Sequence, residues 1–127
     1  MRLLVLVMAL LATSARAHEM VPTYPEFVPS YMDGIQRLTM HMFNKREDVE
    51  YYEVGVFDAD FNPIPFVTSY RLMKIVYLGH VTFDVYVRDS DAIRTKYICT
   101  KSKLRKDDSS VAIVASRICS KIKQADE

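Results

Sequence analysis

The 127-residue chain contains no tryptophan, only three glycines and only two cysteines. It also lacks the short motifs that carry common enzyme chemistry: there is no G-x-S-x-G, no phosphate-binding P-loop, no H-E-x-x-H and no C-x-x-C. These absences remove the usual signatures of nucleophilic, phosphate-binding, metalloprotease and thiol redox chemistry. We therefore predict a protein that is not an enzyme.

The amino terminus has the three parts of an export signal. Arg2 supplies the positive start, residues 3–11 form an apolar run too short to span a bilayer, and residues 15–17 form an A-x-A cleavage site. We predict a signal peptide at residues 1–17 and one mature domain at residues 18–127. The mature protein is expected to be secreted or periplasmic.

The rest of the chain lacks an excess of charge of either sign. Loss of Arg2 and Arg16 with the signal changes the formal net charge from +1 to −1. A nearly neutral domain with interspersed charges lacks the basic surface that binds nucleic acid. No later apolar stretch is long enough for a stable membrane span, and residue 18 is not a lipid-accepting cysteine.

The two cysteines predict one disulfide, because an even count in an exported chain favours pairing over free thiols. Cys99 and Cys119 lie equally far from Ser109, which belongs to a charged loop at residues 105–110. A hairpin with arms at residues 94–104 and 111–122 therefore places them opposite each other. They reach bonding distance if they form a non-hydrogen-bonded pair.

Alternation of apolar residues predicts further strands over residues 35–43, 49–57 and 81–88. Weaker segments at residues 64–67 and 70–77 are also expected to be extended. The predicted inner faces contain these residues: Leu38, Met40, Met42, Tyr52, Val54, Val56, Val81, Phe83, Val85 and Val87. About seven short strands separated by turn signals are typical of an all-β, antiparallel β-sandwich.

Two sets of residues are candidates for binding a partner protein. The aromatics Phe43, Tyr51, Phe57 and Tyr86 fall on the predicted outer faces and could form a patch, although a misassigned face would place them in the core. The apolar segment 111–115, which contains Val111 and Ile113, could be an exposed edge that adds to a partner's sheet. The same segment could instead be a central strand.

His18 is the candidate metal ligand. Cleavage after Ala17 would give it a free amino group, and this group and the imidazole can together chelate copper. Such a site needs a second imidazole, which His41 or His80 would have to supply. Without this copper site, no cofactor is expected.

Three segments together resemble the amino-terminal immunoglobulin-like domain of periplasmic pilus chaperones. They are LTMHMFN at residues 38–44, YYEVGVF at 51–57 and LGHVTFDVYV at 78–87. The resemblance implies an immunoglobulin-like sandwich that assists assembly by adding an edge strand to a partner. Family members also have a second domain, and a cleft Arg and Lys that bind a subunit's terminal carboxylate; neither feature can be matched here. The chain also resembles short signal-bearing proteins of marine tailed phages.

Three functions remain open from the sequence. The first is an exported, non-enzymatic binding or assembly module that acts through a sheet edge or an aromatic face. The second is a periplasmic copper-binding protein that uses His18. The third is a virus-encoded structural or surface protein in which the fold serves as a rigid scaffold.

Overall fold

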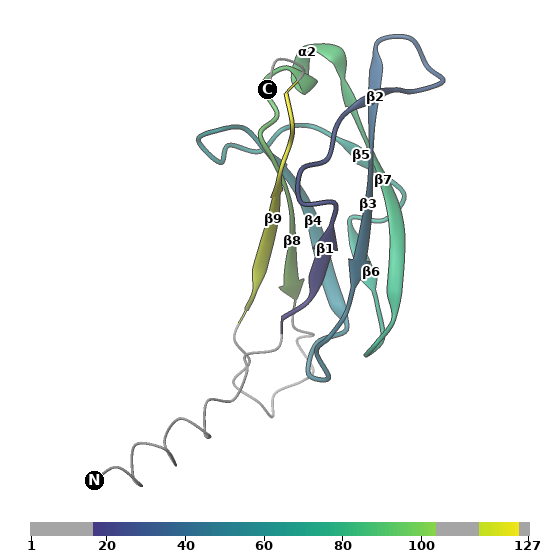
Figure 1. Cartoon of the computed structure of the whole chain (residues 1–127), viewed down its shortest axis with the longest axis vertical. Coiled ribbons are helices and arrows are strands. Elements are labelled where there is room, and N and C mark those ends of the chain that lie inside the picture. Colours follow the sequence, from purple (N-terminus) through teal and green to yellow (C-terminus); the bar gives the residue numbers. More distant parts are fainter. Residues whose placement is uncertain (1–16, 104–114, 125–127) are drawn as a thin grey trace, which may run out of the picture.

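The computed structural model describes residues 17–103 and 115–124, which fold into two antiparallel sheets packed face to face (Figure 1). The candidate segment containing Val111 and Ile113 and the turn at Ser109 lie outside the described residues. The described elements, in chain order, are β1 (Glu19–Val21), β2 (Val28–Pro29), β3 (Ile35–Phe43), β4 (Tyr51–Phe57), β5 (Val67–Thr68), β6 (Leu72–Lys74), β7 (His80–Arg88), α2 (Asp89–Ala92), β8 (Tyr97–Lys103) and β9 (Arg117–Lys121).

The strand order is that of an immunoglobulin-like sandwich. One sheet has the order β1-β3-β7-β5, with β2 also paired to β3, and the other has the order β6-β4-β8-β9. The chain changes sheet at every step from β3 to β8 and stays within one sheet from β1 to β3 and from β8 to β9. Such crossings between the two sheets are typical of this fold. The predicted all-β immunoglobulin-like fold is confirmed.

The core forms between the faces that alternation predicted. Strands β3 and β7 pair along nine residues, from Ile35 opposite Arg88 to Phe43 opposite His80. Their inward side chains meet those of β4 and β8 between the sheets. Burial of each large apolar side chain contributes about 1.5–3 kcal/mol to folding. The most deeply buried apolar residues are Tyr52, Leu38, Met40, Met42, Ile98, Ile122, Val56, Val85 and Val87.

The described residues contain nine strands where about seven were expected, because short edge segments also pair. Strands β1, β2, β5 and β6 have only two or three residues each. Proline limits several of these segments, since it cannot donate a ladder hydrogen bond. After β7 the chain forms a short helical turn, α2. Among the described residues, no helix has the length and apolarity needed to cross a membrane.

Candidate functional site

Strand β9 forms an edge of the four-stranded sheet, and β8 is its paired neighbour (Figure 1). Two hydrogen bonds flanking the strand establish its phase: the N–H of Ser102 donates to the carbonyl of Ser116, and the N–H of Ile122 donates to the carbonyl of Lys96, both at 2.8 Å. Hydrogen-bonded pairs alternate with non-hydrogen-bonded pairs in an antiparallel ladder. The even-numbered residues of β9 therefore direct their backbone groups toward β8.

The odd-numbered residues of β9 direct their backbone groups toward the free edge. Arg117, Cys119 and Lys121 are all exposed, and their N–H and C=O groups have no backbone partner within the described chain. Beyond the end of β9, Lys123 has a backbone partner from another segment: its N–H donates to the carbonyl of Pro25 at 2.8 Å. Arg117, Cys119 and Lys121 thus have no backbone hydrogen-bond partner in the described chain, and β1 lies close to β9.

The predicted disulfide joins β8 to this edge strand. Cys99 lies directly opposite Cys119, with a Cα–Cα distance of 4.1 Å, and the two sulfurs are bonded. The phase of the ladder makes them a non-hydrogen-bonded pair, as the hairpin prediction required. The bond holds the register of β9 on β8 while leaving the backbone groups of Cys119 facing outward.

Side chains on the outer face of this sheet form rows that run across the strands to the free edge. In one row Glu53 lies opposite Lys101, and Lys101 lies opposite Arg117. The carboxylate of Glu53 is ion-paired with Lys103, with Oε2 and Nζ 2.6 Å apart. Two cations therefore lie next to each other at the edge end of this row.

An aromatic cluster positions the Arg117 side chain. The ring of Phe61 stacks on Tyr97 with 4.6 Å between centroids, and Phe57 lies 5.9 Å from Phe61. The Arg117 guanidinium lies 5.2 Å from the Phe61 centroid and 5.9 Å from that of Phe57. Cation–π attraction of this kind holds the guanidinium over the rings at the edge of the sheet.

The turn that presents Phe61 has an unusual backbone. Phe61 has a φ of 60°, which is uncommon for a residue other than glycine. The Asp58 carboxylate stabilises the turn by accepting the N–H groups of Asn62 and Asp60, both at 2.9 Å. These hydrogen bonds, that from Asn62 first, lower the pKa of Asp58 below its ordinary value.

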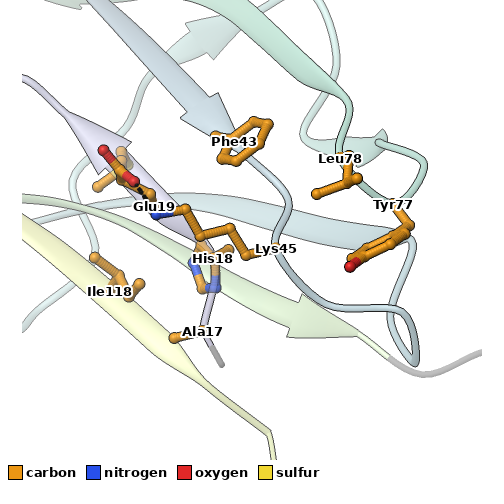
Figure 2. Close-up of a pocket in the computed structure, with 9 residues that line it drawn as sticks. Ala17, His18, Glu19, Phe43, Lys45, Tyr77, Leu78 and Ile118 are labelled. Atoms are coloured by element: carbon orange, nitrogen blue, oxygen red, sulfur yellow. Dashed lines mark ion pairs between the residues drawn. The ribbon is translucent and has the colours of Figure 1, made fainter. Parts of the chain in front are cut away.

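A pocket of about 650 Å³, open to solvent, lies beside β1 and β9 (Figure 2). Figure 2 shows Ile118, Phe43 and Leu78 around the segment at Ala17, His18 and Glu19. The remaining lining residues are Met20, Lys45 and Tyr77, and Lys45 pairs with Glu19 at 2.6 Å. The pocket thus offers apolar side chains and one ion pair beside the inner face of β9.

His18 belongs to a chain of hydrogen bonds at this end of the sandwich. Its side chain is buried, with Nε2 lying 2.8 Å from Thr100 Oγ1 and 3.2 Å from the Thr100 carbonyl. Because a carbonyl only accepts, we assign the ring proton to Nε2. Nδ1 then accepts from the Ser116 hydroxyl at 3.3 Å, and that hydroxyl oxygen accepts from the Arg46 guanidinium at 3.3 Å.

The surroundings of His18 favour the neutral imidazole. Burial lowers its pKa, the hydrogen bond to the Thr100 backbone opposes this change, and the positive charge of Arg46 lowers the pKa further. The ring also packs against Tyr52, with 4.7 Å between centroids. Burial raises the pKa of Tyr52 to about 12, so the phenol is also neutral.

The three histidines of the suggested copper site lie apart in the structure, and copper binding itself stays a prediction. The imidazole of His18 faces the inside of the sandwich, and both its nitrogens are engaged. His41 lies exposed on the outer face of the other sheet, bonded to Thr82 Oγ1 at 2.6 Å, and His80 is exposed at the start of β7. The described chain brings neither imidazole to His18, because outward and inward positions alternate along β3 and β7. It also contains no group of three or more His, Cys, Asp or Glu residues that could hold a metal.

Asn44, the last residue of the segment 38–44, is a structural residue that was not among the predicted site residues. It is fully buried, and its amide donates to the carbonyls of Val49 and Ile75, both at 2.8 Å. Its side-chain oxygen accepts from the Arg46 N–H at 2.9 Å and from the Tyr52 hydroxyl at 2.6 Å. The available signal was its position, because Asn44 continues the buried alternation of β3.

Arg46 and Asp48 extend this polar group toward the surface. The Arg46 guanidinium donates to both oxygens of Asp48, at 2.9 and 2.6 Å. This hydrogen bonding lowers the pKa of Asp48. The paired guanidinium then reaches Ser116 next to β9, which connects the loop after β3 to the edge strand.

The four predicted partner-binding aromatics do not form one patch. Phe43 and Tyr86 belong to the five-stranded sheet, whereas Tyr51 and Phe57 belong to the four-stranded sheet. All four are half-buried and alternate with core residues, so they lie on outer faces of opposite layers. Phe43 lines the pocket and Phe57 joins the aromatic cluster at β9. The sequence interpretation missed Phe61, Tyr97 and Arg117, because a loop and two strands bring them together.

Comparison with known proteins shows what this architecture is similar to. No protein-family model matches the chain, and no curated protein matches it. Among solved structures, it is similar to the E. coli chaperone DraB, with a TM-score of 0.62 and 17% sequence identity over 84% of this chain and 53% of that chain. The likeness shows that the chain shares the fold of part of DraB. The chain spans about half the length of DraB. The predicted chaperone resemblance is thus confirmed for the fold, while the resemblance to phage proteins stays a prediction.

Proposed function

We propose that this chain is an exported, non-enzymatic module that binds a partner protein by pairing β9 with a strand of that partner. The main observation behind this proposal is the free edge from Arg117 to Lys121. In the described chain, the outward-facing backbone groups there have no backbone partner. Unpaired edge groups are a template for strand addition. The fold likeness to a chaperone supports the same use of the domain.

Two restraints hold β9 in place before any partner binds. The disulfide ties Cys119 to β8, and the N–H of Ile122 is bonded to Lys96 beyond the strand's end. A partner strand therefore pairs with groups that are already ordered, which lowers the entropic cost of binding. Each new backbone hydrogen bond contributes about 0.5–1.5 kcal/mol net.

The pocket beside β9 supplies a place for apolar side chains of the added strand. Ile118 projects from the inner face of β9 and lines the pocket together with Phe43 and Leu78. Side chains of an added strand alternate between the two faces. Those on the inner side lie beside Ile118, where burial of apolar surface adds to the backbone pairing.

A proline substitution tests the pairing. Lys121→Pro removes an N–H that faces away from β8, so the β8–β9 ladder keeps its hydrogen bonds. Lys121→Gln is the matched control, since it removes the same charge and keeps the N–H. Each purified protein is used to capture partners from the native envelope or virion fraction after circular dichroism has shown that it is folded.

The expected result is a specific partner captured by the wild type and by Lys121→Gln but lost with Lys121→Pro. Equal capture by both variants, or no specific partner for the wild type, contradicts strand pairing at β9.

Export is tested separately by the mass of the secreted product. Cleavage after Ala17 predicts a protein that begins at His18 and contains one disulfide. An intact mass that includes residues 1–17 contradicts the export signal. A different start excludes the copper alternative, which requires a free amino group on His18.

A further inference from the structure

The outer face beside β9 presents three rows of side chains to an added strand. The first ends in Lys101 and Arg117, which lie directly opposite each other. The second ends in Cys99 and Cys119 and carries no charge. The third ends in Tyr97 and Lys121. Any strand paired with β9 must place its outer-face side chains at the ends of these rows.

The first row is unfavourable by itself. Lys101 and Arg117 form a non-hydrogen-bonded pair, and like charges placed opposite each other are destabilising; the Arg117 guanidinium lies over the Phe57 and Phe61 rings. Glu53, on the other side of Lys101, pairs with Lys103. Within the described chain, neither Lys101 nor Arg117 has an ion-pair partner. A carboxylate beside Arg117 would compensate this row.

Lys121 places a second cation at the same edge. It is exposed, lies four residues from Arg117 on the same face, and has no ion-pair partner in the described part of the chain. The spacing matches two outer-face positions on an added strand with one position between them, opposite Cys119. Both end positions are suited to acidic residues, and the middle one to an uncharged residue.

We infer that the partner strand of β9 has the pattern acidic, apolar, uncharged, apolar, acidic. The acidic residues lie beside Arg117 and Lys121, and the apolar residues lie on the inner side with Ile118. This inference rests on the proposed strand pairing and adds the chemistry of the partner.

The same charges disfavour a second copy of this chain as the occupant. Antiparallel pairing of two β9 strands centred on Cys119 would put Arg117 of each copy opposite Lys121 of the other. Like charges on facing edge strands oppose such pairing. An acidic strand avoids this repulsion and gains attraction at both ends, so the edge selects its partner by charge.

Short peptides test the pattern directly. The probe is the acetylated and amidated heptapeptide Thr-Glu-Val-Ser-Val-Glu-Thr, whose sequence reads the same in both directions and so tests parallel and antiparallel addition together. Matched peptides carry Gln or Lys in place of both Glu residues. Binding is measured at low salt by NMR titration of the full mature chain, following the amide signals of Arg117, Cys119 and Lys121.

The Glu peptide is expected to bind about three- to tenfold more tightly than the Gln peptide, because two exposed charge pairs each contribute modestly. The Lys peptide is expected to bind most weakly. The advantage of the Glu peptide should shrink in high salt, where screening shortens the range of charge interactions.

Charge-reversal variants of the protein provide a second test of the acidic pattern. Arg117→Glu and Lys121→Glu should each reduce the preference for the Glu peptide and strengthen binding of the Lys peptide. Lys74→Glu is the matched control, because Lys74 is exposed at the opposite edge of the same sheet. It makes the same change in net charge and should leave the preference unchanged.

Equal binding of the three peptides at β9 overturns the acidic pattern and leaves strand pairing intact. Absence of binding by all three, or shifts confined to amides outside β9, also overturns this inference. The proposed function is then decided by the separate comparison of Lys121→Pro with Lys121→Gln.

Discussion

Cys99 and Cys119 are bonded across a non-hydrogen-bonded position of the β8–β9 ladder. The disulfide therefore fastens the edge strand through its outer face, without using the backbone groups of Cys119 that face the free edge. A covalent tie and an available edge coexist because side chains and backbone groups of a strand point in different directions.

Removal of the disulfide should lower stability while the fold survives. The bridge closes a loop with a sequence separation of 20 residues, which corresponds to about 3 kcal/mol of stabilisation. The double variant Cys99→Ala/Cys119→Ala is expected to lose about that much unfolding free energy in urea. Reductant should destabilise the wild type and leave the variant unchanged. Two reactive thiols in the unreduced, unfolded wild type would show that the bond does not form.

Stability should depend on pH through His18. Its pKa in the folded state is lowered from 6.5, so the unfolded chain binds this proton first as the pH falls. The stabilisation is fully present above pH 6.5 and is lost as the pH decreases toward the lowered folded-state pKa. The slope should not exceed about 1.4 kcal/mol per pH unit for one proton. Urea unfolding at a series of pH values measures it.

His18→Gln is the control for this dependence, because an amide can still donate to the Thr100 carbonyl and does not titrate. The variant should lose the pH-dependent part assigned to His18, while His41 and His80 are unchanged. A variant with the same slope as the wild type would contradict the assignment.

Asn44 should contribute more to the free energy of unfolding than the hydroxyl of Tyr52. Asn44→Ala leaves two buried carbonyls and two donors without their partner, and we expect a loss of about 3 kcal/mol or more. Tyr52→Phe removes one donor while Asn44 keeps the Arg46 N–H, and should cost about 1 kcal/mol. Urea unfolding compares the two, and equal losses would refute the central role of Asn44.

Replacing Gly55 or Gly79 with alanine should change stability by different amounts. A Cβ at Gly55 would lie 2.7 Å from the outer end of the Phe57 ring, which can move, so Gly55→Ala should change stability by less than about 1 kcal/mol. A Cβ at Gly79 would lie 2.9 Å from the backbone oxygen of Val76. Gly79→Ala should cost about 1–3 kcal/mol, because backbone must shift. Thermal unfolding of both variants checks the order.

Much of the sandwich could be predicted because its central strands are half-buried. Strand β3 has the predicted bounds, and the Leu38, Met40, Met42 face is buried as alternation indicated. The cysteine pairing followed from their equal distances from Ser109. Short strands such as β2 and β5 carry too few residues to show a period, so pairing with neighbours decides them.

The chain's own pattern determined the all-β class, the inner faces of the main strands and the pairing of Cys99 with Cys119, since each depends on local alternation or on spacing within one hairpin. Only the tertiary structure decided that His18 is buried, that the predicted aromatics lie on opposite layers, and that Arg117 and Lys121 line a free edge. These relationships depend on which strands from distant parts of the chain become neighbours, and periodicity within one strand carries no information about its neighbours in space.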